Sequence, residues 1–494
     1  METDVIVVGA GPVGTTLALL LAQAGVTVLL ADHAADIYPL PRAAHIDHEI
    51  VRVFQALGAA EAVTAASRVT ANYDFLTAGG ELLMRFGGAD RLGPGGWPAA
   101  NMIHQPSVEA ALRARFAAAP SLTARTEWTL IDYVAAPQGV RARFDTPEGE
   151  KTVGGRYLVG CDGARSTVRG VEGIDLEDLD FDEPWLVIDT LVLDPSRLPT
   201  ANLQICDPNR PTTCVLMGSG RHRWEFMLKP GETPEAALDD DFIAACLAPW
   251  NVEGAVTLER KAVYRFHALI ARQWRRGRVF LAGDAAHQTP PFAGQGLCAG
   301  VRDAANLAWK LAAVLRGDAG DALLDSYQTE RTPHVRAAID LALMMGRTVC
   351  ITDPAAAAAR DSALLAQRAG QASESGPPPA DGGLGPGCWL EGWPGAGEYF
   401  PQPRAGDGAA ITRLDDSAGP GAWLVTRKSE AGAPGLAALA IDDPVFAPFA
   451  PDVSRWLDRH GAEAVLVRPD RYVFAAGSPG ALREAWATAL TGRS

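Results

Sequence analysis

Hydrophobic and polar positions near the start of the chain follow first the period of a strand and then that of a helix. Residues 4–8 form a continuous run rich in β-branched side chains, as expected of a buried parallel strand. Residues 14–24 predict a helix that Gly25 ends, and residues 26–31 predict a second strand. This β-α-β order is the expected frame of a dinucleotide site, so the pattern predicts an α/β, Rossmann-like domain.

Further along, the pattern changes twice. Residues 108–118, 302–316 and 321–345 predict helices, and residues 279–282 predict another buried strand. Between them, residues 181–230 contain alternating segments such as 185–192 and 223–228, which predict a mainly antiparallel sheet. A sheet inserted between segments of the α/β domain is a candidate layer for binding a substrate.

The last third of the chain begins with a break in the pattern. An alanine run at 355–359, followed by residues 373–387 with three consecutive prolines, predicts a linker. A small α/β pattern then begins, with strands predicted at 423–426, 464–467 and 472–475 and a helix at 480–491. The sequence therefore predicts a separate C-terminal domain.

Composition excludes several classes of partner. The chain has 494 residues, which is more than one ordinary domain, and a formal net charge of −15 without any Lys/Arg cluster. This balance argues against nucleic acid and anionic membranes. We expect neither a signal peptide nor a membrane span. The seven scattered cysteines form neither CxxC nor zinc spacing, so we expect no metal and a reduced, cytoplasmic setting.

The first glycine motif is Gly9-x-Gly11-x-x-Gly14, which follows a predicted strand and opens a predicted helix. Gly9 permits the tight turn, Gly11 lets the backbone approach a pyrophosphate, and Gly14 lets helix and strand pack closely. Asp32, at the end of the second strand, is placed to accept ribose hydroxyls. The motif predicts a dinucleotide site, but it does not choose between NAD and FAD.

Two further glycine segments follow predicted strands. Asp162-Gly163, with Ser166 and Arg169 after it, reads most simply as a turn capped by the serine. Gly283-Asp284 places an acid just past a strand end, which suits a polyhydroxyl chain. It is followed by Pro290-Pro291-x-x-Gly294-x-Gly296 and a helix, whose positive end suits an electron-rich ring such as a reduced flavin.

Together these segments resemble those of the FAD-dependent aromatic hydroxylases, the single-component class A flavoprotein monooxygenases. The order and placement match over residues 4 to about 345, and the resemblance is strongest to the 3-(3-hydroxyphenyl)propionate hydroxylase type and to related phenolic and polyketide hydroxylases. The supporting segments are Pro41-Arg42-Ala43, Arg223-Trp224-Glu225-Phe226, Gly294-Gln295-Gly296 and residues 303–311.

The resemblance implies an FAD-binding domain, an interleaved antiparallel β-sheet domain for substrate, and a thioredoxin-like C-terminal domain. The implied boundaries are 1–72, 100–180 and 267–345 for the first, 73–99 and 181–266 for the second, 346–386 for a helix and linker, and 387–494 for the third. Cys388 is the only cysteine in the last of these, so a dithiol function is excluded there and a structural or oligomerisation role is preferred.

The resemblance also implies binding roles. The residues implied for the ADP half of FAD are Gly9, Gly11, Pro12, Gly14 and Asp32. Those implied for the rest of the cofactor are Arg42 on the flavin side, Gln105 at the ribityl or phosphate region, Asp162 and Gly163 where FAD and NAD(P)H meet, and Gly283 and Asp284 at the ribityl chain. Those bordering the isoalloxazine ring are Pro291, Gly294, Gln295, Gly296 and Leu297, of which Pro291, Gly294 and Gly296 also border the oxygen site. Leu297-Cys298 departs from the Met-Asn of many relatives, which puts a side-chain contact to the ring in doubt.

The implied activity is an enzyme that uses NAD(P)H and O2 to hydroxylate a small phenolic or polyketide aromatic through a flavin C4a-hydroperoxide. The alternatives are an FAD oxidoreductase that inserts no oxygen, a polyketide-tailoring oxygenase and a non-enzymatic flavin-binding protein. The choice between NADH and NADPH stays open, as does association into a homodimer. The phenol-activating base is unassigned, because a packing role is the simpler reading for each candidate: His45, His48, His104, His222, His267 and His287. Packing in a sheet is likewise the simpler role for Tyr264 and Trp224.

Overall fold

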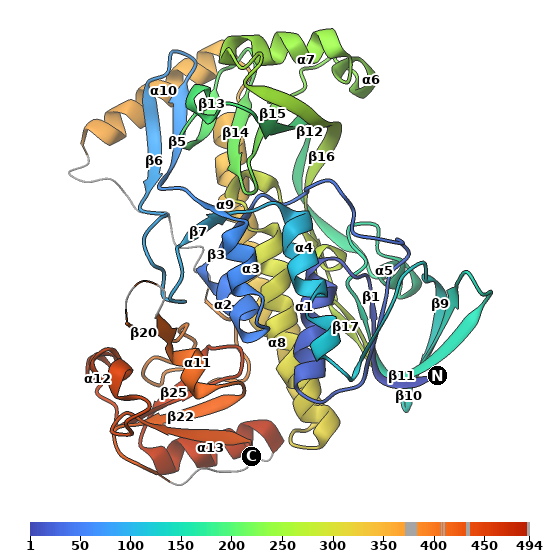
Figure 1. The fold of residues 1–494 in the computed structure, drawn as a ribbon, viewed down its shortest axis with the longest axis vertical. Coiled ribbons are helices and arrows are strands. Elements are labelled where there is room, and N and C mark those ends of the chain that lie inside the picture. The colour runs from blue at the N-terminus through green and yellow to red at the C-terminus, as the bar shows by residue number, and fades with distance from the viewer. Residues whose placement is uncertain (371–382, 407, 409–410, 431–434, 492–494) are drawn as a thin grey trace.

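The computed structural model describes residues 1–370, 383–406, 408, 411–430 and 435–491. One sheet is mainly parallel, in the order β17-β18-β11-β1-β2-β8, and its strands β1 and β11 lie at the lower right of Figure 1. In that order, the strands are Arg275–Arg276, Val279–Leu281, Lys151–Gly160, Glu2–Val8, Val28–Ala31 and Leu122–Arg125. The antiparallel strands β9 (Thr129–Ala136) and β10 (Gly139–Asp145) extend the sheet from β11. Val5–Val8 are buried on both faces, as their unbroken hydrophobic run predicts.

Helices cover this sheet and connect its strands. They are α1 (Pro12–Gln23), α2 (His48–Ala56), α3 (Ala60–Ala65), α4 (Gln105–Arg113), α5 (Thr167–Val171), α8 (Gly296–Arg316) and α9 (Ser326–Val349). The helix predicted over 108–118 starts earlier, with Pro106 in its first turn, and its end is a separate 3-10 turn at Phe116–Ala118. Likewise α8 begins six residues before its predicted start at 302. Glycines at its start masked the helical pattern.

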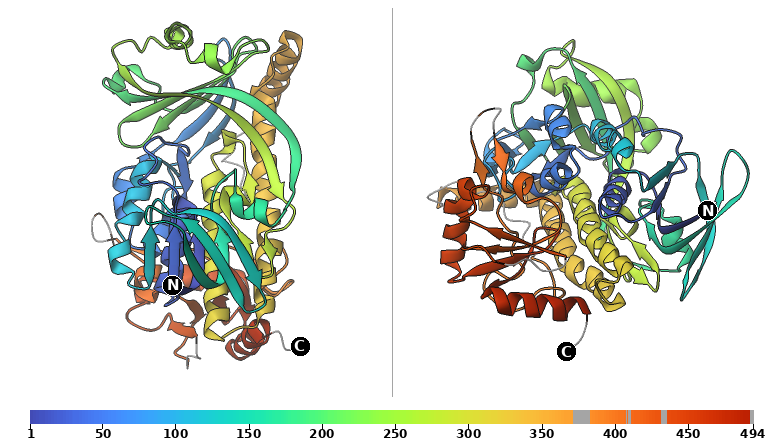
Figure 2. Two further views of the ribbon diagram at one scale, coloured as in Figure 1. Left: turned by 90° about the vertical axis from the view of Figure 1, so that its right-hand side faces the viewer. Right: turned by 60° about the horizontal axis from the view of Figure 1, so that its bottom comes forward.

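The second sheet is the predicted antiparallel layer. Its order is β19-β16-β12-β15-β14-β13-β5-β6, and β13 pairs with β5 in parallel. The strands are His287–Gln288, Val256–Ala271, Leu176–Val192, Arg221–Met227, Thr212–Met217, Asn202–Cys206, Asn72–Thr77 and Leu82–Gly87. Figure 2 shows this sheet curving over the parallel domain. Helices α6 (Pro234–Ala237) and α7 (Asp240–Leu247) lie at its outer side, and β3 (His45–Asp47), β7 (Ala100–Met102) and β4 (Arg68–Val69) form a small sheet below it.

Residues 354–369 form helix α10 (Pro354–Ala369), so the prediction of a linker at 355–359 is wrong. Alanine is the best helix former, and the Asp353 side chain caps the helix by accepting from the Ala356 N–H at 2.8 Å. Part of the predicted linker at 373–387 lies outside the described residues.

The C-terminal domain has a four-stranded mixed sheet in the order β23-β22-β24-β25. Its strands are Leu436–Ala440, Ala422–Thr426, Ala464–Val467 and Val473–Gly477, and its helices are α11 (Leu414–Ala418), α12 (Ala450–Arg459) and α13 (Pro479–Thr491). The short strands β20 (Arg404–Ala405) and β21 (Thr412–Arg413) pair beside it. The predicted strands and helix are therefore present.

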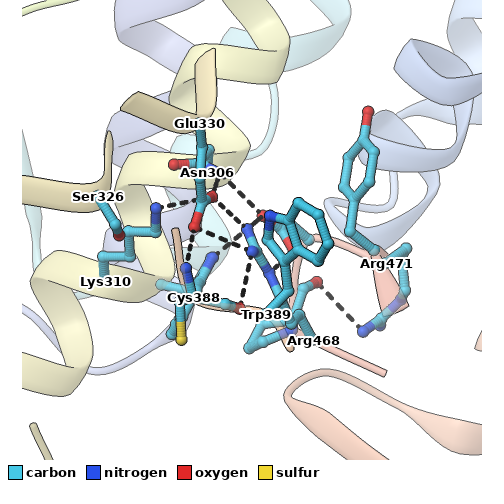
Figure 3. Close-up of polar contacts among 12 residues, drawn as sticks. Asn306, Lys310, Ser326, Glu330, Cys388, Trp389, Arg468 and Arg471 are labelled. Carbon is cyan, nitrogen blue, oxygen red and sulfur yellow. Dashed lines mark hydrogen bonds and ion pairs between the residues drawn. The ribbon is translucent and has the colours of Figure 1, made fainter. Parts of the chain in front are cut away.

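Fully buried charges join this domain to helices α8 and α9. Figure 3 shows Glu330 of α9 at the centre of this cluster. Its carboxylate accepts from Arg468 Nη2 at 2.7 Å and lies 2.8 Å from Lys310 Nζ. Arg468 also pairs with Asp470 at 2.6 Å. Burial opposes ionisation of Glu330, but Arg468 and Lys310 outweigh it and hold the pKa of this carboxyl well below its usual range. The C-terminal domain is thus docked through a buried ion-pair network.

Candidate active site

A cavity of about 1900 Å³ lies between the parallel domain and the antiparallel sheet. Its walls come from both, and a few residues of the C-terminal domain, among them Tyr399 and Tyr472, reach one side. A pocket for a single drug-sized ligand has ~300–1,000 Å³, so this cavity has room for a dinucleotide and a second molecule. Of the sixteen predicted binding residues, all but Gly14 and Gly283 line it.

The glycine loop between β1 and α1 is open toward the cavity at one position. A Cβ on Gly14 would overlap the Gly9 carbonyl oxygen, and a Cβ on Gly9 would come 2.7 Å from the Cys161 carbonyl carbon. At Gly11, in contrast, no atom of the described residues lies within 4 Å of such a Cβ. The α1 N-terminus has no side-chain cap and no acid in its first turn. The loop therefore has the space and free N–H groups that a pyrophosphate needs.

The groups beside this loop hold its shape. Asp32 accepts from the Ala10 N–H at 2.5 Å and from the Ala34 N–H at 2.7 Å. Gln105 accepts from the Ala43 N–H at 2.8 Å, which ties α4 to the segment that carries the exposed Arg42 side chain. Each acceptor thus fixes backbone that borders the cavity.

Asp162 and Gly163 follow β11 as predicted. The Asp162 carboxylate accepts from Ser166 Oγ at 2.5 Å and from the Val168 N–H at 3.0 Å, and Ser166 caps α5 by accepting from the Arg169 N–H. The capped turn expected from the sequence is therefore present. Asp162 and Gly163 also face the cavity, so the turn does not exclude a binding role.

The Gly283-Asp284 turn is held from behind by residues that sequence reasoning did not assign. Asp303 of α8 accepts from the Gly283 N–H at 3.1 Å, pairs with His287 at 2.6 Å and accepts from Arg331 Nε at 2.9 Å. The Asp284 side chain is exposed to the cavity. The protein that surrounds the cavity desolvates its carboxyl, which raises the pKa of this group. His287 is therefore part of the loop architecture, in agreement with the packing role expected from the sequence.

The next loop brings Pro291, Gly294 and Gly296 to the cavity wall. Gly294 has a φ of 64°, and His45 Nδ1 lies 3.1 Å from its carbonyl oxygen. Helix α8 starts at Gly296 without a side-chain cap, so its free N–H groups open onto the cavity. Leu297 lines the cavity, whereas Cys298 is fully buried in the core behind it. The departure at Leu297-Cys298 thus leaves the backbone donors in place.

The sheet side of the cavity carries a chain of hydrogen bonds that reaches this loop. Thr213 Oγ1 donates to Gln204 Oε1 at 2.8 Å, and the Gln204 amide donates to the Tyr73 hydroxyl. Tyr73 in turn donates to the Phe292 carbonyl at 3.2 Å. Phe292 packs against aromatic rings at centroid distances of 5.6–6.1 Å, namely Phe181, Trp185 and Phe266. Polar and aromatic groups therefore face the cavity together.

An arginine–carboxylate cluster fastens the segment around Arg42 to the sheet. Asp189 accepts from Arg223 Nε at 2.6 Å and from Arg260 Nη1 at 3.3 Å. Arg223 also donates to the carbonyls of Pro41 and Arg42, at 2.7 and 2.9 Å. The alternation of side chains along the strand could have predicted this charged face. Trp224 and Phe226 pack in the core on the outer side of the sheet, so Arg223 and Glu225 between them face the cavity.

Some of the remaining candidate residues line the cavity, and others lie away from it. Among the arginines of the antiparallel sheet and its loops, Arg223 lines the cavity, while Arg85, Arg210 and Arg221 pair outside it with Asp74, Glu232 and Glu259. His222 lies beside Trp224 on the outer face, where burial lowers its pKa to about 3. Tyr264 lines the cavity, and Trp224 packs in the core.

Comparisons with known proteins agree with this site. The FAD binding domain family matches residues 2–342, and the HcaD C-terminal domain matches residues 450–492. A probable NADH-specific resorcinol 4-hydroxylase of Rhodococcus jostii (strain RHA1) is 37% identical, over 95% of this chain and 91% of that protein. A 3-(3-hydroxy-phenyl)propionate/3-hydroxycinnamic acid hydroxylase of Mycobacterium sp. (strain JLS) is 40% identical, over 74% of this chain and 63% of that one. This chain therefore spans less than two thirds of the latter enzyme's length.

Among solved structures, the ternary complex of aklavinone-11 hydroxylase with FAD and aklavinone has a TM-score of 0.80 and 26% identity, with 99% of both chains covered. The chain thus belongs to the family of FAD-dependent aromatic hydroxylases. This confirms the predicted family, the fold class and the FAD cofactor. No helix in the described ranges is long and apolar enough to cross a membrane.

Proposed function

We propose that this enzyme hydroxylates a small phenol of the resorcinol type, with NADH as the reductant. The proposal is carried by one cavity that joins an open phosphate loop to a polar, aromatic sheet face. It is supported by the likeness, over nearly the whole chain, to a protein named as an NADH-specific resorcinol 4-hydroxylase. When bound, FAD would supply the hydride acceptor and the group that activates O2.

The chain's own residues would hold and orient the reactants. Gly9, Gly11, Pro12 and Gly14 would hold the pyrophosphate, and Asp284 the ribityl chain. The Pro291–Leu297 segment would border the ring, and the aromatic cluster around Phe292 would keep water out. The phenol would lie against the sheet, between Tyr73 and Arg223.

A second candidate substrate is a phenol that carries a carboxylate. Arg260 is 5% exposed and lines the cavity, and its Nε and Nη2 have no hydrogen-bond partner among the residues that the structure describes. Buried guanidinium donors of this kind suit a carboxylate. The hydroxyphenylpropionate hydroxylase relative is named for such a substrate.

The test is a substrate panel with the FAD-loaded enzyme. Resorcinol, 3-(3-hydroxyphenyl)propionate and a large polyphenol are each offered with NADH or NADPH, while reductant loss, O2 uptake and product mass are followed. We expect resorcinol with NADH to give a product with one added oxygen. Faster turnover of the propionate would favour the second candidate. Reductant loss without any oxygenated product would contradict the proposed function.

A further inference from the structure

Glu225 occupies the middle of the sheet face that closes the cavity. It lies on β15, opposite Val187 of β12 and Thr213 of β14, and it lines the cavity while being only 4% exposed. A buried carboxylate normally has close partners. Its position at the substrate side therefore requires an explanation.

The arginine beside Glu225 is committed elsewhere. Arg223 Nη1 lies 3.6 Å from Glu225 Oε1, which is longer than the ~2.7–2.9 Å of a charge-assisted hydrogen bond. The same guanidinium makes its close contacts with Asp189 and with the backbone of Pro41 and Arg42. Glu225 is thus charge-compensated but retains lone pairs for a donor in the cavity.

The surroundings also adjust the acidity of this carboxyl. Burial raises the pKa of Glu225 to about 6, with Asp189 adding to the rise and Arg223 and Arg260 opposing it. These groups lie on β12, β15 and β16, and Tyr73 faces it from β5. Burial raises the pKa of Tyr73 further above its ordinary value, so this hydroxyl stays protonated. A carboxylate poised near neutral pH is suited to general base catalysis.

Three other acid–base groups near the cavity have structural partners. His45 lies against the Gly294 carbonyl, and burial lowers its pKa. His287 pairs with Asp303. Asp189 is shared by two arginines. Glu225, in contrast, is a buried carboxyl at the cavity whose contact to Arg223 is too long for a hydrogen bond, so it can exchange a proton with a ligand on the sheet face.

We propose that Glu225 is the catalytic base that accepts the phenolic proton of the substrate. The inference rests on the proposed function. The phenol O–H bond breaks, an O–H bond forms on the Glu225 carboxylate, and the negative charge moves to the phenolate oxygen. No oxidant or reductant is consumed in this step. Arg223 and Arg260 keep the total charge compensated, because the carboxylate loses the charge that the phenolate gains. The phenolate enriches the ring for attack on activated oxygen.

The test compares the FAD-loaded wild-type enzyme with Glu225→Gln, using the panel phenol that gives product. Ultraviolet difference spectra across pH measure how much of the bound phenol is phenolate. We expect Glu225→Gln to hold at least tenfold less phenolate at neutral pH and to lose about 10²–10⁴-fold in kcat. FAD occupancy should be unchanged. Glu183→Gln is the matched control, since Glu183 is a half-buried carboxyl on β12, its pKa is also raised by burial, and it does not line the cavity.

Glu225→Asp serves if the glutamine variant does not fold, and it should recover part of the phenolate signal. Wild-type levels of bound phenolate in a folded Glu225→Gln enzyme would overturn the assignment while leaving the proposed function standing. If no panel phenol is hydroxylated by the wild-type enzyme, the proposed function falls instead, and this inference falls with it.

Discussion

Replacing Gly11 or Gly14 by alanine separates cofactor binding from folding within a single loop. At Gly14 the new methyl group would overlap the Gly9 carbonyl oxygen and lie 3.1 Å from Cys161 Cβ, so backbone has to move. Overpacking of this kind costs about 1–3 kcal/mol or more. At Gly11 the backbone has φ −67° and ψ −178°, which alanine adopts freely, and no atom lies within 4 Å. Apo Gly11→Ala should therefore be as stable as wild type, or up to ~1 kcal/mol more stable.

Gly11→Ala, which should leave the stability of the apo protein unchanged, should weaken FAD binding. The Gly11 methyl group would occupy the space through which the pyrophosphate approaches, so we expect at least a ~10-fold weaker affinity, or about 1.4 kcal/mol. The assays are the flavin-to-protein absorbance ratio and thermal unfolding of apo and reconstituted protein. Gly480→Ala in α13 is the control, because its methyl group also meets nothing within 4 Å and lies in the C-terminal domain. Normal FAD affinity in Gly11→Ala, or a destabilised apo form, would refute the reasoning.

Three more predictions concern the charged residues Glu330, Glu225 and Asp284. Glu330→Gln leaves Lys310 and Arg468 without their shared carboxylate and should lower the free energy of unfolding by about 3–5 kcal/mol, measured by thermal unfolding. Arg455→Ala, at an exposed ion pair, should lower it by less than ~1 kcal/mol. Equal losses of stability in the two variants would contradict a buried network. The raised pKa of Glu225 means that the unfolded chain releases this proton first as the pH rises. Wild-type stability should therefore fall relative to Glu225→Gln, by about 2 kcal/mol in all between a pH well below 4.5 and a pH well above 6. Parallel melting curves of the two proteins across pH would count against this prediction. Asp284→Ala should lose FAD occupancy while keeping its fold by circular dichroism, and full occupancy would remove Asp284 from the site.

The elements with a strong local period could be predicted from the sequence. Val5–Val8, the alternation in 223–228 and the C-terminal strands all fold as their patterns indicate. The glycine segments meet at one cavity because the carboxyl ends of parallel strands share an edge. Their placement needed no tertiary information beyond that rule.

The start of α8 shows why other features could not be predicted. Gly296 and Gly300 weaken helix propensity, so the local signal begins only later. In the structure a Cβ on Gly300 would lie 2.6 Å from Val13 Cγ2 and 3.1 Å from Gly283 Cα. The glycine is therefore required by close packing of α8 on α1 and the Gly283 turn. Tertiary packing here outweighs the low helix propensity of glycine, and the sequence alone shows only that propensity.

The same limit applies to Glu225 and Glu330. A glutamate in an alternating strand can face solvent or a cavity, and only the sheet that curves over the parallel domain decides which. Glu330 meets Arg468 across 138 positions of sequence, and this pairing exists only after the C-terminal domain docks. Pairings between distant segments leave no local periodicity to read.

The docking contacts also suggest a role for the C-terminal domain that needs no dithiol, namely to fix helix α8. Asn306 and Lys310 of α8 contact the buried cluster at Glu330, and Asn306 also donates to Asp470 of the C-terminal domain. About three to four turns earlier, the same helix opens onto the cavity at Gly296. A helix is stiff over this distance, so fixing its middle also fixes the direction of its N-terminal N–H groups. Glu330→Gln should then loosen FAD binding as well as lower stability. Unchanged FAD affinity in a destabilised variant would limit the domain to a stabilising role.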